Sequence, residues 1–364
     1  MTTLIEGSFR IWQGASSLIE FLFTIDYEIF GNGTGALNEL VYEPARRLKQ
    51  LFEDHSARFV AFVEVAEFER IDAFGTDAAI ELVKKQISDF HRDGFEIALH
   101  LHPQWSNARY EKGQWILDLS EYNLCSLPKT RIAEIVDVSL NYLRHVIDQP
   151  AFTPLSFRAG NWLFQPTNTA ASVLGERGIK IDSSVFKGGL QRKHGLDYRP
   201  ALKNGYFWPF SSDANRLDGE GSWIEVPVYS QMVPFWKMVT PKRMAFTNTC
   251  GTSDHGTREK LVRAADFLRF LYPLKLDFCR MTHQEFTTML DRVIREDQVD
   301  PDSYRPIVAI GHTKDLMDFD AVDSFLSYLR NKRINISTFS EIYSRLRRVI
   351  GAMDAAGCAQ SHTN

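Results

Sequence analysis

The chain has 364 residues, of which 44% are hydrophobic and 24% charged, and its formal net charge is -4. This composition is ordinary for a globular protein that buries a sizeable core. No dense tract of Lys and Arg is present, so we do not expect nucleic acid as a partner. The four cysteines lie far apart and form no C-x-x-C pair, which argues against a disulfide framework and against a cysteine-rich zinc site.

The first residues show no basic start followed by an apolar run, and no stretch approaches the roughly 20 apolar residues needed to cross a bilayer. We therefore expect a cytoplasmic protein without a membrane span. The oligomeric state is left open by the sequence.

Strand-like apolar runs alternate with helical patterns along most of the chain. Helices are expected over Leu40–Phe52, over residues 80–90 with Gly94 as the end signal, and over residues 132–143. Strands are expected at Phe21–Ile25, Arg58–Val65, Phe95–Leu101, Leu155–Phe157, Ile179–Ile181, Trp223–Val228, Pro306–Ile310 and Ile334–Phe339.

This alternation indicates parallel βαβ units, and their number favours a barrel over an open sheet. There is no G-x-G-x-x-G after the first strand and no G-K-[ST], which disfavours the nucleotide-binding α/β folds. We divide the chain into an N-terminal extension (1–20), a barrel (21–346) with an irregular insertion at about 191–254, and a C-terminal tail (347–364) that is expected to fray.

Chemically active side chains recur at one kind of position, the C-terminal end of a predicted strand. This is the end of an α/β barrel at which active sites form. The residues in question are Asp26, Glu28, His100, His102, Arg158, Asp182 and His312.

His100 and His102 lie two residues apart in an extended segment, so both rings point the same way, and Pro103 ends the strand beyond them. Two histidines and one carboxylate form a metal site with open positions for water and substrate. Asp26 and Glu28 also share a face. One of them can bind the metal while the other accepts a proton from water, and the spacing leaves the assignment open.

His312 is placed to protonate a leaving amine near neutral pH, and Arg158 is placed to pair with Asp26 and keep it ionised. A structural histidine and an ordinary ion pair are the alternative interpretations. Trp105 and Trp162 are expected to line the cleft and bind substrate, because apolar sugar faces stack on aromatic rings.

These segments resemble motifs of the polysaccharide deacetylases, carbohydrate esterase family four. The motifs occur in the family's order between about Phe21 and Arg345. They are T-I-D-Y-E at 24–28, E-I-A-L-H-L-H-P at 96–103, F-R-A-G-N-W at 157–162, I-D-S-S at 181–184 and Ile310-Gly311-His312.

The resemblance implies a deformed, incomplete (β/α) barrel and a metal-dependent hydrolase that removes an N-acetyl group from an amino sugar or glycan precursor. Zinc is the first expectation for the metal, with Co, Ni and Mn as alternatives. In the roles that it implies, Asp26 is the general base and His312 the general acid. Arg158 then orients the base, Asp182 tunes the acid, and His100 is the first metal-binding histidine.

The chain departs from the family pattern at two positions. Tyr27 follows Asp26 where the family has a second aspartate, so Glu28 is the best substitute for the metal carboxylate. The family's histidines lie four residues apart, which would place the second at Gln104, so His102 must take that position. A deformylase or other amide hydrolase with the same machinery, and a carbohydrate-binding barrel that has lost its metal and its activity, are the alternative functions.

Overall fold

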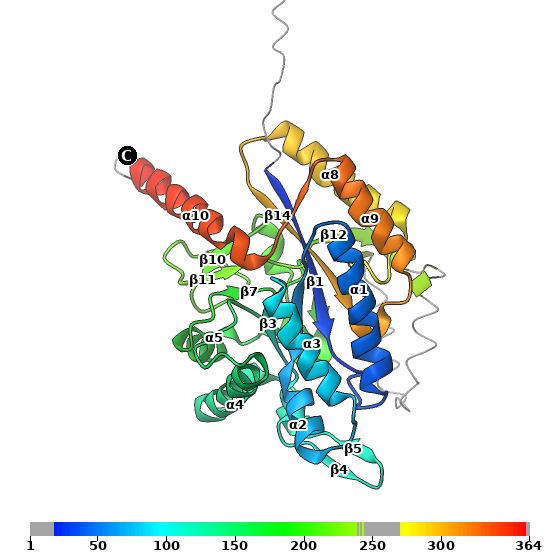
Figure 1. Ribbon diagram of the computed structural model, residues 1–364. Coiled ribbons are helices and arrows are strands. Elements are labelled where there is room, and N and C mark those ends of the chain that lie inside the picture. The colour runs from blue at the N-terminus through cyan, green and yellow to red at the C-terminus, as the bar shows by residue number, and fades with distance from the viewer. Residues whose placement is uncertain (1–17, 239, 241, 244–269, 362–364) are drawn as a thin grey trace, which may run out of the picture.

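The computed structural model describes residues 18–238, 240, 242–243 and 270–361 (Figure 1). Its centre is a nine-stranded curved sheet in the order β10-β11-β7-β6-β3-β2-β1-β14, with β15 also paired to β1. All its ladders are parallel except β10 with β11. The strands are β1 (Ile19–Tyr27), β2 (Val60–Glu64), β3 (Glu96–Leu101), β6 (Ser156–Ala159), β7 (Ile181–Asp182), β10 (Trp208–Phe210), β11 (Trp223–Glu225), β14 (Arg305–His312) and β15 (Asn335–Ile336).

Helices lie around the outside of this sheet, and α10 extends away from it (Figure 1). They are α1 (Glu43–Asp54), α2 (Val65–Phe74), α3 (Ile80–Arg92), α4 (Lys129–Ile147), α5 (Thr167–Glu176), α8 (His283–Val299), α9 (Phe319–Asn331) and α10 (Phe339–Ser361).

The remaining elements are hairpins and short helices outside the main sheet. The hairpins are β4 (Arg109–Glu111) with β5 (Gln114–Ile116), β8 (Leu190–Gln191) with β9 (Leu196–Asp197), and β12 (Ser230–Pro234) with β13 (Leu271–Lys275). The short helices are η1 (Asn38–Tyr42), η2 (Pro103–Trp105), η3 (Leu119–Glu121), η4 (Leu124–Ser126), η5 (Gly160–Trp162), η6 (Arg192–His194), η7 (Pro200–Lys203), η8 (Phe235–Met238) and η9 (Thr313–Asp315).

The sheet curls into a barrel that no full strand closes within the described part of the chain. Val228 forms single bridges to Phe186 on one side and Val308 on the other, and Asp277 bridges to Ile310. Isolated bridges therefore span the opening between β7 and β14. This confirms the expected α/β fold with a deformed, incomplete barrel.

Burial explains why the strands read as unbroken apolar runs. Every residue of β1 is buried, as expected for a parallel strand that is covered on both faces. Phe59 joins the sheet to the helices, because its ring packs against Phe52 at 5.2 Å, Phe90 at 5.4 Å and Phe95 at 4.6 Å between centroids.

The structure differs from the sequence expectation in several elements. The strand expected through Val65 ends at Glu64, where the chain passes directly into α2, because the Glu64 side chain accepts a hydrogen bond from the backbone of Glu67 and caps that helix. Helices α2, α5, α8, α9 and α10 were also not predicted from the sequence. Within the described part of the stretch at 191–254, β10 and β11 belong to the main sheet rather than to an insertion over one face.

The ends of the chain also bear on the proposed division. The expected N-terminal extension lies almost wholly outside the described residues, and β1 begins at Ile19. At the other end, α10 runs without a break across the boundary expected at residue 347. Within the described residues, no helix combines the length and the apolar character that a membrane crossing needs.

Removing the Phe59 ring should destabilise the fold strongly. Phe59 is fully buried among three other rings, so Phe59→Ala should lower the free energy of unfolding by about 3–5 kcal/mol. Phe74, which is 47% exposed, is the matched control, and Phe74→Ala should cost less than about 1 kcal/mol. Denaturant unfolding monitored by circular dichroism measures both, and equal losses would contradict this account of the core.

Candidate metal and catalytic site

The predicted strand ends meet at one mouth of the barrel. Asp26 of β1 lies opposite His312 of β14 in the sheet register, and His100 of β3 lies opposite Arg158 of β6. Parallel strands place their C-terminal ends at a common edge, which is why residues so distant in the chain come together. They surround a cavity of about 510 Å³ that is lined by Asp26, Glu28, Phe30, Gly31, Asn32, Thr34, His100, His102, Ala159, Asn161, Trp162, Lys275, Arg280, His312 and Lys314.

His100 presents one ring nitrogen to this cavity. Its Nδ1 donates a hydrogen bond to the Arg158 carbonyl at 2.9 Å, so Nε2 faces the carboxylates of Glu28 at 3.5 Å and Asp26 at 3.9 Å. Nε2 is buried and has no hydrogen-bond partner among the described residues. Burial lowers the pKa of His100, but Asp26 and Glu28 outweigh it and raise the pKa to about 9. The surroundings therefore favour positive charge at this nitrogen.

His102 points to the same place although it lies beyond the end of β3. Its backbone N–H donates to Glu64 Oε2 at 2.6 Å, and its Nε2 lies 3.2 Å from Glu28 Oε2. The amides of Gln104 and Asn161 both reach its Nδ1 at 3.2 Å. The spacing of two residues thus brings both histidines to the Glu28 carboxylate. Gln104 contacts His102 at the ring nitrogen that faces away from Glu28.

The donor set fits a divalent metal ion. Ligand atoms of Glu28, Glu64, His100 and His102 lie within 4.8 Å of one another, and so do those of Asp26, Glu28 and His312. Glu28 belongs to both groups. The orphaned Nε2 of His100 and the neighbouring carboxylate are a combination typical of catalytic zinc sites. The Nδ1 hydrogen bond to a carbonyl is also typical of metal-binding histidines, because it orients the ring.

Lys314 was not anticipated from the sequence. Its Nζ lies 2.7 Å from Glu28 Oε1 and also donates to the Ile29 carbonyl at 3.0 Å. Burial raises the pKa of Glu28, but Lys314 and the two histidines lower it well below its usual value, so Glu28 is ionised. The signal available in the sequence was the position of Lys314 in Gly-His-Thr-Lys, two residues after His312.

Asp26 is held ionised by a buried arginine. Arg158 Nη1 donates to Asp26 Oδ1 at 2.5 Å, and its other nitrogens donate to Thr24 Oγ1 at 2.9 Å and to the Ser183 carbonyl at 3.0 Å. Burial raises the pKa of Asp26, but Arg158 and the nearby histidines lower it below its ordinary value. The second oxygen, Oδ2, faces His312 Nε2 at 3.5 Å.

His312 is aligned by a carboxylate other than the expected one. Asp182 hydrogen-bonds to Ser184 and contacts Glu225, and it does not reach His312. Asp315 Oδ2 lies 3.6 Å from His312 Nδ1 instead, and Arg280 holds Asp315 through Nε at 2.9 Å. The reason is local, because the turn η9 folds Asp315 back toward the histidine three residues before it.

The two tryptophans have different environments. Trp162 lines the cavity, and it follows Asn161 in a turn where both residues have positive φ angles, of 68° and 54°. Trp105 is 1% exposed and packs edge-on against Trp115 at 5.1 Å between centroids. Trp105 therefore belongs to the core, and the expectation that it lines the cleft is wrong.

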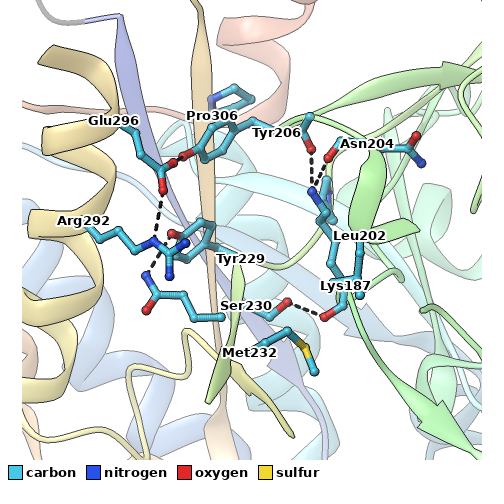
Figure 2. Close-up of a pocket in the computed structure, with 13 residues that line it drawn as sticks. Lys187, Leu202, Asn204, Tyr206, Tyr229, Ser230, Met232, Arg292, Glu296 and Pro306 are labelled. Carbon is cyan, nitrogen blue, oxygen red and sulfur yellow. Dashed lines mark hydrogen bonds and ion pairs between the residues drawn. The ribbon is translucent and has the colours of Figure 1, made fainter. Parts of the chain in front are cut away.

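A second cavity, of about 360 Å³, lies near Pro306 at the other end of β14 (Figure 2). Its polar side chains are bonded to one another or to the backbone. Tyr206 donates to Glu296, Gln231 donates to Tyr229 at 3.0 Å, and Lys187 donates to the Asn204 and Gly205 carbonyls. The cavity at the mouth of the barrel differs, because within the described residues it contains two buried ring nitrogens without a hydrogen-bond partner, His100 Nε2 and His312 Nδ1.

Glu225 and Asp182 are a fully buried carboxyl pair, and burial raises the pKa of both, that of Glu225 well above its usual value. Because its pKa is raised, Glu225 is protonated near neutral pH and can donate a hydrogen bond to the neighbouring Asp182. The unfolded chain releases this proton near pH 4.5 and the folded chain keeps it, so the stabilising contribution of the pair is complete below that pH and is lost as the pH rises toward the folded pKa.

Glu225→Gln should remove this pH dependence, since the amide donates without ionising. The stability difference between the variant and the wild type should shift in favour of the variant by at least about 1 kcal/mol between pH 5 and pH 8. A shift of this size corresponds to less than one pKa unit. Denaturant unfolding at both pH values measures the difference. Parallel stability curves for the two proteins would mean that Glu225 ionises normally.

No model of a known protein family matches the chain, and no curated protein matches it. Among solved structures it is similar to a protein of Mycobacterium smegmatis described as a polysaccharide deacetylase, with 14% identity, 92% of each chain covered and a TM-score of 0.53. It is also similar to a protein of Pseudomonas aeruginosa PAO1 described as a polysaccharide deacetylase (14% identity, 92% of each chain, TM-score 0.49) and to Puue allantoinase (13% identity, 91% of this chain and 90% of that chain, TM-score 0.48). The likeness to the Mycobacterium smegmatis structure shows that the chain has the polysaccharide deacetylase fold.

Proposed function

We propose that the protein is a metal-dependent hydrolase that removes an N-acetyl group from an amino sugar or glycan precursor. One observation carries the proposal. A buried aspartate, ionised by Arg158 and facing His312, stands beside a Glu-His-His set in which His100 Nε2 has no hydrogen-bond partner. This is the combination of base, acid and metal ligands that amide hydrolysis requires.

Glu28, His100 and His102 would hold the metal, with zinc as our first choice. A divalent ion at this position supplies Lewis-acid polarisation of the acyl carbonyl and lowers the pKa of a bound water molecule. His100 is oriented for this role by the Arg158 carbonyl. For His102, the buried Gln104 Oε1, which has no partner, would accept its Nδ1 proton after a half-turn of the amide.

Asp26 acts as the general base. Its Oδ1 is occupied by Arg158, so Oδ2 is the oxygen that takes a proton from the attacking water. Because Arg158 favours the ionised aspartate, Asp26 holds that proton weakly. His312 Nε2, at 3.5 Å from Oδ2, can receive it and deliver it to the leaving amine. Asp315 stabilises the charged imidazole from the other side.

Burial lowers the pKa of His312 although Asp26 and Asp315 act in the opposite direction, so the ring is neutral at rest near neutral pH. A neutral ring is ready to accept the proton that Asp26 removes from water. The acid and the base therefore work as a relay, in which one proton moves from water to the amine.

Two further parts of the proposal concern the substrate and its place in the cell. A cytoplasmic location favours small glycan precursors over finished polymers. A deformylase would use the same residues, and analysis of the released acid, acetate or formate, separates the two. The ion pair between Lys314 and Glu28 favours the remaining alternative, a binding barrel without a metal, because Lys314 already neutralises the proposed ligand.

The roles of Asp26 and Glu28 can be separated by amide substitutions. Asp26→Asn should keep the metal and abolish turnover, because an amide cannot accept the proton from water. Glu28→Gln should weaken metal binding by on the order of 10-fold or more, and added metal should partly restore activity. Metal content by elemental analysis and affinity by calorimetry measure both effects.

Glu67→Gln is the matched control, since this glutamate lies behind the site, accepts the Ile29 N–H and has a pKa that burial raises well above its usual value. It should retain the metal. Loss of metal in Asp26→Asn together with retention in Glu28→Gln would exchange the two roles, and a wild type without metal affinity would reject the metal-dependent mechanism.

His312→Ala should reduce kcat by about 100-fold or more and change KM little, if proton transfer contributes its usual amount. The alanine variant removes the relay and leaves Asp26, Arg158 and the proposed metal ligands in place. Steady-state kinetics with an N-acetylated amino sugar test this. A variant with nearly wild-type kcat would show that another group protonates the amine.

A further inference from the structure

Lys275 stands apart from the other cations of the catalytic cavity. Arg280 is bonded to Asp315, and Lys314 is bonded to Glu28. Among the described residues, the Lys275 ammonium group contacts aromatic rings but forms neither an ion pair nor a hydrogen bond. Asp277, the acidic residue nearest to Lys275 in the sequence, accepts hydrogen bonds from the backbone of Cys279 and Arg280 rather than from Lys275.

The fold holds Lys275 firmly at this position. It is the last residue of β13 and pairs with Ser230 across the hairpin. The next residue, Leu276, donates its N–H to the Tyr229 carbonyl at 2.8 Å, and Asp277 bridges to Ile310 of β14. The backbone of Lys275 is therefore tied to the strand that ends at His312, and its side chain starts from a fixed position beside the proposed catalytic residues.

The ammonium group lies over two aromatic faces, 3.9 Å from the centroid of Trp162 and 4.9 Å from that of Phe186. Burial lowers its pKa to about 8, which leaves most of the group charged at neutral pH. A desolvated cation gains from aromatic faces, but an anion satisfies it better.

Trp162 is positioned by backbone strain. A positive φ is unfavourable for a bulky residue, and here two in succession, Asn161 and Trp162, adopt it. The Trp162 carbonyl accepts a hydrogen bond from Tyr198 at 2.6 Å and the Asn161 carbonyl one from Gln191 at 3.2 Å, which hold the turn. The turn places the indole at the cavity, where its face lies under the Lys275 ammonium group.

We propose that Lys275, held over the Trp162 indole, forms a subsite for an acidic sugar, in which the ammonium group binds a carboxylate or phosphate on the substrate. This inference rests on the proposed deacetylase function and narrows its substrate class to anionic N-acylated amino sugars. A neutral sugar would leave the ammonium group without an anionic partner.

The test uses substrates that differ in charge. N-acetylglucosamine is compared with its 1-phosphate, its 6-phosphate and N-acetylmuramic acid, which carries a carboxylate. The wild type should prefer at least one charged sugar in kcat/KM, and the preferred one identifies the anion as phosphate or carboxylate. Lys275→Met should lower kcat/KM for that sugar by on the order of 10- to 100-fold, the usual range for a hydrogen bond to a charged group, and should change the neutral sugar by less than about 3-fold.

Lys187→Met is the matched control. Lys187 is also a partly buried lysine near an aromatic ring, 6.0 Å from Trp208, but it lines the second cavity (Figure 2). Its substitution removes the same charge from the protein and should preserve the preference for the charged sugar. A wild type without preference for any charged sugar overturns the subsite. An equal loss on neutral and charged sugars in Lys275→Met also overturns it, because Lys275 would then act on the reaction itself.

Calorimetric binding of the same sugars separates this inference from the proposed function. If no sugar is hydrolysed but the charged one binds 10- to 100-fold more tightly to the wild type than to Lys275→Met, the deacetylase proposal fails and the subsite stands. If hydrolysis occurs and Lys275→Met binds charged and neutral sugars as the wild type does, the subsite fails and the deacetylase proposal stands.

Discussion

The site depends on one buried ion pair, between Arg158 and Asp26. A fully buried guanidinium is costly unless its charge is paired and its N–H groups are bonded, and Arg158 meets both conditions through Asp26, Thr24 and Ser183. Its cation also lies 3.9 Å from the face of Phe62. The same residue uses its carbonyl to accept the Nδ1 proton of His100. Arg158 thereby sets both the charge of the proposed base and the orientation of the first proposed metal ligand.

Two further buried carboxyl groups bind the backbone of the loops that follow the strands. Glu64 binds the backbone N–H of His102, and Glu67 binds that of Ile29, next to Glu28. Burial raises the pKa of Glu64 to about 7 and that of Glu67 well above its usual value, so these groups add less negative charge than their number suggests. They fix backbone positions while Glu28 and Asp26 remain the ionised carboxylates of the cavity.

The open side of the barrel gives the cavity its character. Because only isolated bridges of the described residues span the gap between β7 and β14, the hairpin of β12 and β13 can place Lys275 beside the proposed catalytic residues. The result is a cavity with one half suited to a metal and to proton transfer and the other half suited to an aromatic and cationic contact. That division is what connects the proposed reaction to an acidic sugar.

Much of this arrangement could be predicted from the sequence, because strand periodicity and strand ends are local properties. The pattern of alternating elements indicated the barrel, and the strand ends of β1, β3, β6 and β14 identified Asp26, Glu28, His100, His102, Arg158 and His312 as neighbours. Two-residue spacing in an extended segment was enough to place both histidines on one side.

Contacts between distant segments were decided by the tertiary structure. The sequence could not distinguish Asp182 from Asp315 as the partner of His312, because the choice depends on how η9 folds against β14 and how Arg280 reaches it. The sequence could not show that Trp105 is buried while Trp162 lines the cavity, because burial depends on what packs against each ring. Lys275 carried no local signal at all. Its place beside Trp162 follows from a hairpin that packs across the opening of the barrel, and packing between segments more than 100 residues apart is set by side-chain fit in three dimensions rather than by any local pattern.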